Sequence, residues 1–383
     1  MKRLIPVITL LIISSSSCSY LKNVNLLTGG SLERKDFVQE IPFSYRKGLI
    51  IVQANINDDT TVREFIFDTG AFNSKIEKRL AEDIGLETIT TKENSTAQGI
   101  TETIEVTRID SIRFGETTFY NIGAGKLEYD EKSYSPCVAK DGLIGSNLIK
   151  LAHWKIDYQN RKIYFSDKPF ESVAEQSIRI SFDRPVLSST PKIKLNIENE
   201  EVSGLMFDTG FNGGLVMPAS LAGAFSSSDS QRFIDRSTSG IYGSNTDTLI
   251  EKSLAVSFDS REYRIPVEFS SLGKGLIGND LLEHFTVLID NDDDEITLEQ
   301  TNEVVVEKGR SFIPGILNDS LWVVNRISEN SSSIRLGDTL RLVNGKRPGE
   351  IFTNHCDYFL NLESLLNGDS VRVKTLKNQA IHL

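Results

Sequence analysis

Short runs of alternating or β-branched apolar residues recur along the chain and predict a mainly β protein. An alternation with a period of two gives a strand one buried face, and many short strands separated by turn signals favour a closed or sandwiched β architecture. One segment, Glu77–Ile84, instead has helical spacing and ends at Gly85, where a helix is expected to stop. The predicted strands with the clearest pattern are Leu49–Ile56, Ile104–Ile109, Ile193–Ile197 and Leu254–Phe258.

Two blocks of the sequence occur twice. The segment Glu64–Gly70 (EFIFDTG) returns 140 residues later as Gly204–Gly210 (GLMFDTG). The block Gly142–Gly145 (GLIG) returns as Gly275–Gly278, and an Ile-Asp pair ends 12 residues after the last glycine in both copies. Equal spacings of this kind indicate an internal duplication.

The duplication predicts two β lobes, residues 43–165 and 178–299, joined by the polar segment Ser166–Ser177. A third β domain, residues 305–383, follows. In it, Asn344-Gly345 suits a tight hairpin turn and Gly337 suits a left-handed turn, because these residues tolerate positive φ.

The stretch Ile334–Lys346, which holds Gly337-Asp338 and Asn344-Gly345, resembles the Gly-Asp…Asn-Gly hairpin signature of a bacterial PDZ domain. PDZ domains bind a peptide as an added strand, beside a loop of backbone amides. The best candidate for that loop is Phe312–Leu317. The alternative is an ordinary β-hairpin in a C-terminal extension.

Composition supports a globular protein. Of the 383 residues, 39% are hydrophobic and 25% are charged, which is enough apolar material for sizeable cores. The formal net charge is −11, and such a surface repels phosphate backbones, so we expect no nucleic-acid partner.

The N-terminus is typical of an exported protein. Lys2 and Arg3 precede the apolar run Leu4–Ile13, and small residues follow up to Cys18. The run is too short to span a bilayer. Residues 1–17 followed by a cysteine resemble a bacterial lipoprotein signal, although Ser15 stands where a leucine is usual. The resemblance implies a lipid on Cys18 and attachment to the cell envelope, in the outer membrane or periplasm. The alternative is a soluble exported protein cut near Ser17.

Cysteines and histidines give no sign of a metal site. Cys137 and Cys356 lie in different predicted domains, and we expect two unpaired thiols rather than a disulfide, although an oxidising compartment permits the bond. The four histidines are dispersed, so we expect no metal and no cofactor.

Asp68 and Asp208 are the candidate chemical groups. Each follows an apolar strand that anchors it, and the glycine two residues later allows other groups to approach closely. Two carboxylates related by a repeat can meet across a pseudo-twofold axis and hold one proton between them. The ionised member can then deprotonate a water while the protonated member donates to a scissile carbonyl. Such a pair hydrolyses an amide at acidic to neutral pH.

The segments Phe67–Ala71 and Phe207–Gly210, each with its Leu-Ile-Gly block, resemble the retropepsin and pepsin families of aspartic proteases. Ala71 makes the first segment closer to retropepsins, and the resemblance covers Phe43 to Leu298. It implies two pseudo-symmetric β-barrel lobes and a catalytic pair at Asp68 and Asp208. It also implies that Thr69, Gly70, Thr209 and Gly210 support the two aspartates. The two threonines are expected to form hydrogen bonds across the lobe interface. With the signal and the PDZ-like tail, the chain is similar to bacterial retropepsin-like proteases.

Two details qualify the resemblance. Phe211 stands where a small residue is usual, and neither it nor Ala71 supplies a hydroxyl. Members of these families close β-hairpin flaps over the substrate, and the candidate flap residues here are Gly99, Gly240 and Tyr242, with Tyr242 reaching into the cleft. Plain loop glycines are the alternative.

The leading hypothesis is therefore an aspartic-type endopeptidase that cleaves an extended polypeptide, acts as a monomer and is held to a membrane by its N-terminal lipid. A second hypothesis is a non-catalytic peptide-binding lipoprotein that uses the same cleft and the PDZ-like module. A third is a scaffold whose working part is the PDZ-like tail.

Overall fold

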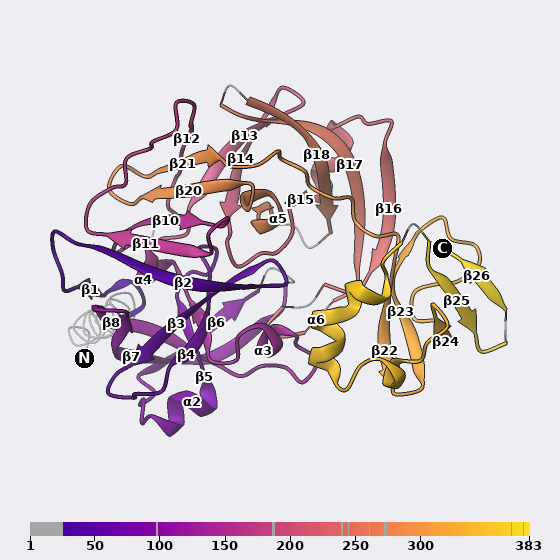
Figure 1. Cartoon of the computed structure of the whole chain (residues 1–383), viewed down its shortest axis with the longest axis horizontal. Coiled ribbons are helices and arrows are strands. Elements are labelled where there is room, and N and C mark those ends of the chain that lie inside the picture. Colours follow the sequence, from indigo (N-terminus) through magenta and orange to yellow (C-terminus); the bar gives the residue numbers. More distant parts are fainter. Residues whose placement is uncertain are drawn as a thin grey trace, which may run out of the picture.

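The computed structural model describes residues 26–96, 99–185, 188–238, 240–243, 245–259, 261–271, 274–368, 370–377 and 379–383. The predicted signal peptide and Cys18 lie outside these residues. Within them the protein is mainly β, as the sequence pattern predicted, and its strands form two large sheets (Figure 1). No helix in this described part is both long enough and apolar enough to cross a membrane.

The first lobe is one continuous ladder. Its strand order is β3-β4-β9-β5-β8-β7-β6, with β9 parallel to β4 and antiparallel to β5. The strands are β3 (Leu49–Ile56), β4 (Arg63–Phe67), β5 (Ser74–Glu77), β6 (Thr90–Ser95), β7 (Thr101–Phe114), β8 (Thr117–Leu127) and β9 (Gly142–Ile144). A short strand, β1 (Ser31–Leu32), also pairs with β8.

The second lobe repeats this order as β13-β14-β19-β15-β18-β17-β16, again with a parallel pair, β14 and β19, next to the antiparallel pair β15 and β19. The strands are β13 (Lys192–Ile197), β14 (Glu200–Phe207), β15 (Leu215–Pro218), β16 (Ser230–Asp235), β17 (Asp247–Phe258), β18 (Arg261–Ser270) and β19 (Leu276–Ile277). The sequence repeat is thus a structural repeat.

A six-strand segment of the larger sheet joins the lobes. Its order is β12-β21-β20-β10-β11-β2, and the central pair, β10 with β20, brings one strand from each repeat together. The strands are β2 (Val38–Arg46), β10 (His153–Asp157), β11 (Lys162–Ser166), β12 (Ile178–Ser181), β20 (Phe285–Asp290) and β21 (Glu295–Gln300). The predicted linker, Ser166–Ser177, is fully described: Ser166 is the last residue of β11, and residues 167–177 form no helix or strand.

One aromatic cluster lies directly behind the first Asp-Thr-Gly motif. Trp154 is fully buried, and its ring centroid lies 5.0 Å from that of Phe67 and 4.9 Å from that of Phe165. Buried aromatic side chains contribute large apolar areas and hold a defined geometry. Because Phe67 immediately precedes Asp68, this core fixes the end of β4.

The helices are short. The predicted helix is α2 (Lys78–Asp83): the Glu77 carboxylate accepts from the amides of Arg79 (2.9 Å) and Leu80 (2.7 Å), and Gly85 has a φ of 73°. It therefore begins and ends where its sequence signals stand. The remaining helices of the lobes are α3 (Ser135–Val138), α4 (Ser146–Ile149), the 3-10 helix η1 (Ala219–Ala224) and α5 (Asn279–Leu282).

The C-terminal domain has its own core but shares a sheet with the second lobe, because β23 pairs with β16. Asn344 and Gly345 have φ values of 48° and 78°, and Gly337 of 84°, which confirms the predicted turns. The elements are β22 (Phe312–Asn318), β23 (Leu321–Ser328), β24 (Thr339–Val343), η2 (Pro348–Glu350), α6 (His355–Leu365), β25 (Arg372–Thr375) and β26 (Ala380–His382).

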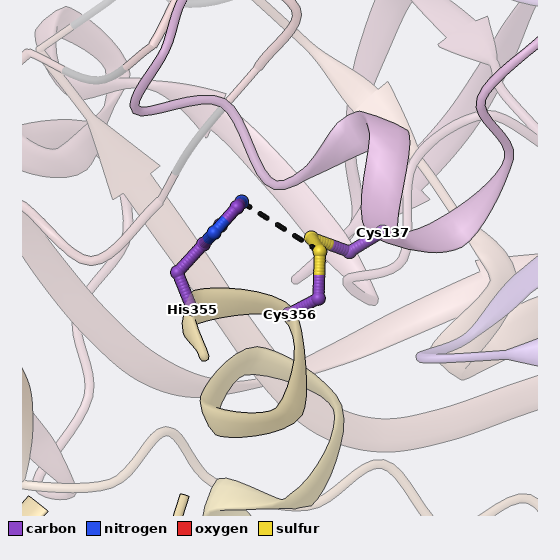
Figure 2. A group of neighbouring side chains, drawn as sticks. All are labelled: Cys137, His355 and Cys356. Carbon is purple, nitrogen blue, oxygen red and sulfur yellow. Dashed lines mark hydrogen bonds between the residues drawn. A yellow bond between two sulfur atoms is a disulfide. The ribbon is translucent and has the colours of Figure 1, made fainter. Parts of the chain in front are cut away.

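Two expectations for this region are wrong. The predicted amide loop, Phe312–Leu317, is part of β22, which pairs with β23 over its length. The predicted free thiols of Cys137 and Cys356 form a disulfide between α3 and α6, with the two Cα atoms 5.1 Å apart (Figure 2). The helices meet because the rings of Tyr134 and Phe359 stack, with centroids 4.7 Å apart. A contact across 219 residues of sequence is not visible from cysteine spacing.

Candidate active site

Both candidate aspartates lie at equivalent places in the repeat. Asp68 directly follows β4, and its amide donates to the carbonyl of Ile144 on β9 at 2.9 Å. Asp208 directly follows β14, and its amide donates to the carbonyl of Ile277 on β19, also at 2.9 Å. The repeated Leu-Ile-Gly blocks therefore hold the two turns. Both aspartates line a single cleft.

The two threonines connect the turns across the lobe interface. The Thr69 hydroxyl donates to the carbonyl of Phe207 and accepts from the amide of Thr209, at 2.7 and 3.0 Å. The Thr209 hydroxyl donates to the carbonyl of Phe67 and accepts from the amide of Thr69, at 2.7 and 3.1 Å. Both threonines are fully buried. This reciprocal arrangement locks the two motifs face to face.

The two glycines explain how closely the carboxyls approach. A Cβ atom on Gly70 would collide with the carboxyl of Asp208, and a Cβ atom on Gly210 would collide with the carboxyl of Asp68. Each carboxyl thus lies against the backbone of the opposite motif. The carboxyls of Asp68 and Asp208 are close enough for each to change the pKa of the other.

The surroundings give the two carboxyls of the pair different pKa values. Removal from water raises the pKa of Asp68, and the positive charge of Lys75 opposes this effect. Removal from water also raises the pKa of Asp208, and the negative charge of Asp68 raises it further, to well above the ordinary range. The arrangement therefore favours a proton on Asp208 and an ionised Asp68. The Oδ1 atom of Asp68 also accepts from the Ala71 amide at 2.7 Å.

The cleft has a volume of about 480 Å³ and three walls. One wall belongs to each lobe, and the third belongs to the C-terminal domain. The residues of this third wall come from β22, β23 and α6: Ile313, Asn325, Arg326, Tyr358, Phe359, Leu362 and Glu363. The cleft is thus narrower than the two lobes alone would make it.

The first candidate flap is the β6–β7 hairpin. Gly99 lies in the turn of this hairpin, and its amide donates to the carbonyl of Thr96 at 3.1 Å. Thr96 lines the cleft, and its carbonyl also accepts from the Lys274 ammonium of the second lobe at 2.9 Å. The hairpin therefore contacts the second lobe through Thr96.

The second candidate flap is the loop of residues 240–243. Gly240 and Gly243 form an isolated bridge, and Gly240 lines the cleft. Tyr242 does not line it, contrary to expectation, because its hydroxyl accepts from the side-chain amide of Asn94 on β6 at 3.0 Å. The two candidate flaps therefore contact one another.

Phe211 forms part of the cleft wall and leaves the aspartate in place. Its ring occupies the space beside Gly213 and Gly278, where a Cβ atom on either glycine would collide with it. Its carbonyl accepts from the amide of Asn279 at 2.9 Å. The glycines of this lobe thus accommodate the large ring.

Lys75 and Lys274 are among the cleft residues that sequence reasoning missed. The signal for Lys75 lies in the repeat. Lys75 pairs with Leu143 on β9, as Val216 pairs with Leu276 on β19, so β5 has a lysine where the apolar strand β15 has a valine.

A group of potential metal ligands lies outside the cleft. Cys137 on α3 lies next to His355 and Cys356, the first two residues of α6, and the His355 Nε2 atom lies 3.6 Å from the Cys356 sulfur (Figure 2). Because the two sulfurs are bonded to each other, they are not thiolate ligands.

The comparison with protein families agrees with the geometry of the first lobe. Residues 52–148, which include Asp68 and the first Leu-Ile-Gly block, match the model of the Aspartyl protease family. No curated protein has a significant match to the chain. The family match supports an aspartic-protease relationship for this lobe.

Proposed function

We propose that the protein is an aspartic-type endopeptidase in which Asp68 and Asp208 form the catalytic pair. The observation that carries the proposal is the contact of each carboxyl with the glycine of the opposite motif, at the floor of a single cleft. One chain supplies both carboxyls, so a monomer contains a complete site. The matched family model supports the same reaction class.

The pKa of Asp208 is raised further than that of Asp68, and this difference suggests the role of each carboxyl. Asp68, which is the ionised member, takes a proton from a water held between the pair. The water attacks the peptide carbonyl, and the protonated Asp208 donates to the carbonyl oxygen as charge develops there. The proton taken by Asp68 then goes to the nitrogen as the C–N bond breaks, and Asp208 takes back its proton from the hydroxyl of the tetrahedral intermediate, which restores the pair. No covalent intermediate forms with the protein.

Two substitutions test this proposal. Asp68→Asn and Asp208→Asn each remove an ionisable group with little change in volume, so turnover of an unstructured protein should fall by at least about a hundredfold. The assay should cover acidic and neutral pH and include a statine-type inhibitor. Asp293→Asn, at an exposed turn between β20 and β21, is the matched control and should keep full activity. Normal turnover by folded Asp68→Asn would contradict the proposal.

A non-catalytic peptide-binding protein is the second candidate. It is favoured by the lack of a hydroxyl next to either motif, at Ala71 and Phe211, and by the third wall that narrows the cleft. The same assay distinguishes the two, because such a protein binds the unstructured chain and leaves it intact. Under both hypotheses, the C-terminal domain acts as a PDZ-like module that helps to select the chain entering the cleft.

We also propose that the protein is exported and attached to the cell envelope through a lipid on Cys18. The Cys137–Cys356 disulfide supports export, because such bonds persist in oxidising compartments. Labelling cells with a radioactive fatty acid should mark the protein, and Cys18→Ser should abolish the label. A labelled Cys18→Ser variant would exclude this anchor.

A further inference from the structure

Lys75 is an unusual residue for its position. Only 5% of its surface is exposed, and it lies on β5 between the buried residues Ser74 and Ile76. The second repeat has Val216 at the equivalent place in the ladder, so the fold does not require a charged residue there.

The Lys75 ammonium makes no hydrogen bond or salt bridge with any residue that the structure describes. Burial of an ammonium without a hydrogen-bonded partner is unfavourable and lowers the pKa of Lys75, and the negative charge of Asp68 opposes this effect. Lys126, which is also buried at 6% exposure on the neighbouring strand β8, does have a partner, since its ammonium lies 3.7 Å from the Glu105 carboxylate. Lys75 instead points its charge into the cleft that contains Asp68.

A second cation lies on the other side of the pair. Lys274, half-buried in the second lobe, lines the cleft and interacts electrostatically with Asp208. Four cations (Lys47, Lys75, Lys274 and Arg326) and three acids (Asp68, Asp208 and Glu363) line the cleft, so the cleft is on balance positive, whereas the chain as a whole carries a net charge of −11. A ligand attracted to this cleft is therefore one that carries negative charge.

We propose that Lys75 binds a carboxylate of the polypeptide substrate and makes the protein prefer acidic residues next to the scissile bond. This proposal rests on the proposed function and names the substrate class. An ammonium has three donors, and a charge-assisted bond to a carboxylate is among the stronger ones that a substrate can form. Asp68 is not the carboxylate that binds Lys75, because its own carboxyl already accepts a hydrogen bond from the Ala71 amide and faces Asp208.

Matched peptides test the preference. A cleaved peptide is first found in a peptide library, and variants are then made with Glu or Gln at each position within three residues of the cut. Wild-type kcat/KM should be about tenfold higher for the best Glu peptide than for its Gln partner. The Lys75→Met variant should reduce this ratio to about one, and Lys126→Met should leave it unchanged. A ratio near one for the wild type, or a ratio that survives Lys75→Met, would overturn the proposal.

Two further measurements identify the carboxylate and separate binding from turnover. Peptides with an amidated C-terminus show which carboxylate Lys75 binds. If amidation abolishes cleavage, Lys75 binds the terminal carboxylate of the peptide, and the preference for acidic side chains is overturned. If cleavage is unchanged, Lys75 binds a side-chain carboxylate. If the wild type cleaves no peptide, the proposed function fails, and the dissociation constants of the Glu and Gln peptides then decide the preference by themselves. Equal constants for the wild type would overturn it.

Discussion

The charge of Lys75 also affects how the proposed catalytic pair responds to pH. Its ammonium lowers the pKa of Asp68, and the proposed mechanism requires an ionised Asp68 as the base. In Lys75→Met, the pKa of Asp68 rises, so activity on the acidic side of the profile should be lost at a higher pH than in the wild type. The alkaline limb, set by the raised pKa of Asp208, should move less. A pH profile of kcat/KM with a neutral peptide measures both limbs, and an unmoved acidic limb would contradict this assignment.

A substitution of Thr69 tests the hydrogen bonds that join the two lobes. Thr69→Val keeps the shape of the side chain but leaves the Phe207 carbonyl and the Thr209 amide without their partner in a buried place. Each such group should cost about 1–3 kcal/mol in the free energy of unfolding. Urea titration measures the loss, and Thr69→Ser should recover most of it. A Thr69→Val protein as stable as the wild type would show that these bonds contribute little.

Single residues differ in how far the sequence reveals them. The pairing of Asp68 with Asp208 could be predicted because the motif occurs twice in the same context, and a duplicated motif implies a shared axis. Lys75 could not be assigned to the cleft in this way. Its position depends on the β5–β9 register, which tertiary pairing sets, and a lysine in a strand normally indicates an exposed face.

At the scale of elements, the disulfide between α3 and α6 joins the third wall to the first lobe. Cys356→Ser should lower the free energy of unfolding by about 2–4 kcal/mol, since the bond closes a long loop. It should also allow α6 to move away from the cleft. Limited proteolysis near α6 and a thermal melt, each with and without a reducing dithiol, measure the two effects. The wild type should respond to the reductant and Cys356→Ser should not.

The elements that the sequence predicts best are those with local signals. β3 has the bounds of its apolar run, and α2 has its acidic cap and terminal glycine. The prediction fails at β22, where the apolar segment Phe312–Leu317 is a strand and not the expected loop. Its partner, β23, forms the hydrogen bonds that make it a strand, and this pairing is a tertiary property.

The C-terminal domain and the second lobe form one hydrogen-bonded unit at the scale of the whole molecule, because β16 pairs with both β17 and β23. A chain truncated after residue 304 exposes the edge of β16 and removes one wall of the cleft. Unpaired edges of this kind promote association, so the truncated protein should elute as larger species in size-exclusion chromatography, whereas the full chain elutes as a monomer. A monomeric truncated protein would show that the lobes are independent of this domain.

The plan of two lobes could be predicted from the duplication, and the tail could be recognised as a separate β domain. The place of that domain could not be predicted, because it depends on the β16–β23 pairing and on α6 meeting α3 (Figure 1). Both contacts join surfaces that have no repeated or local pattern in the sequence.

The pairing of β10 with β20 has a consequence for what the protein can process. The backbone hydrogen bonds between β10 and β20 join one strand from each repeat, so the two repeats cannot move apart at this pair without breaking main-chain bonds. A wider cleft must therefore come from movement of the β6–β7 hairpin, which the hydrogen bond from Lys274 to Thr96 holds to the second lobe. Under the proposed function, a folded domain is too bulky for such an opening, and the polypeptide must enter as a stretch that has already lost its native structure.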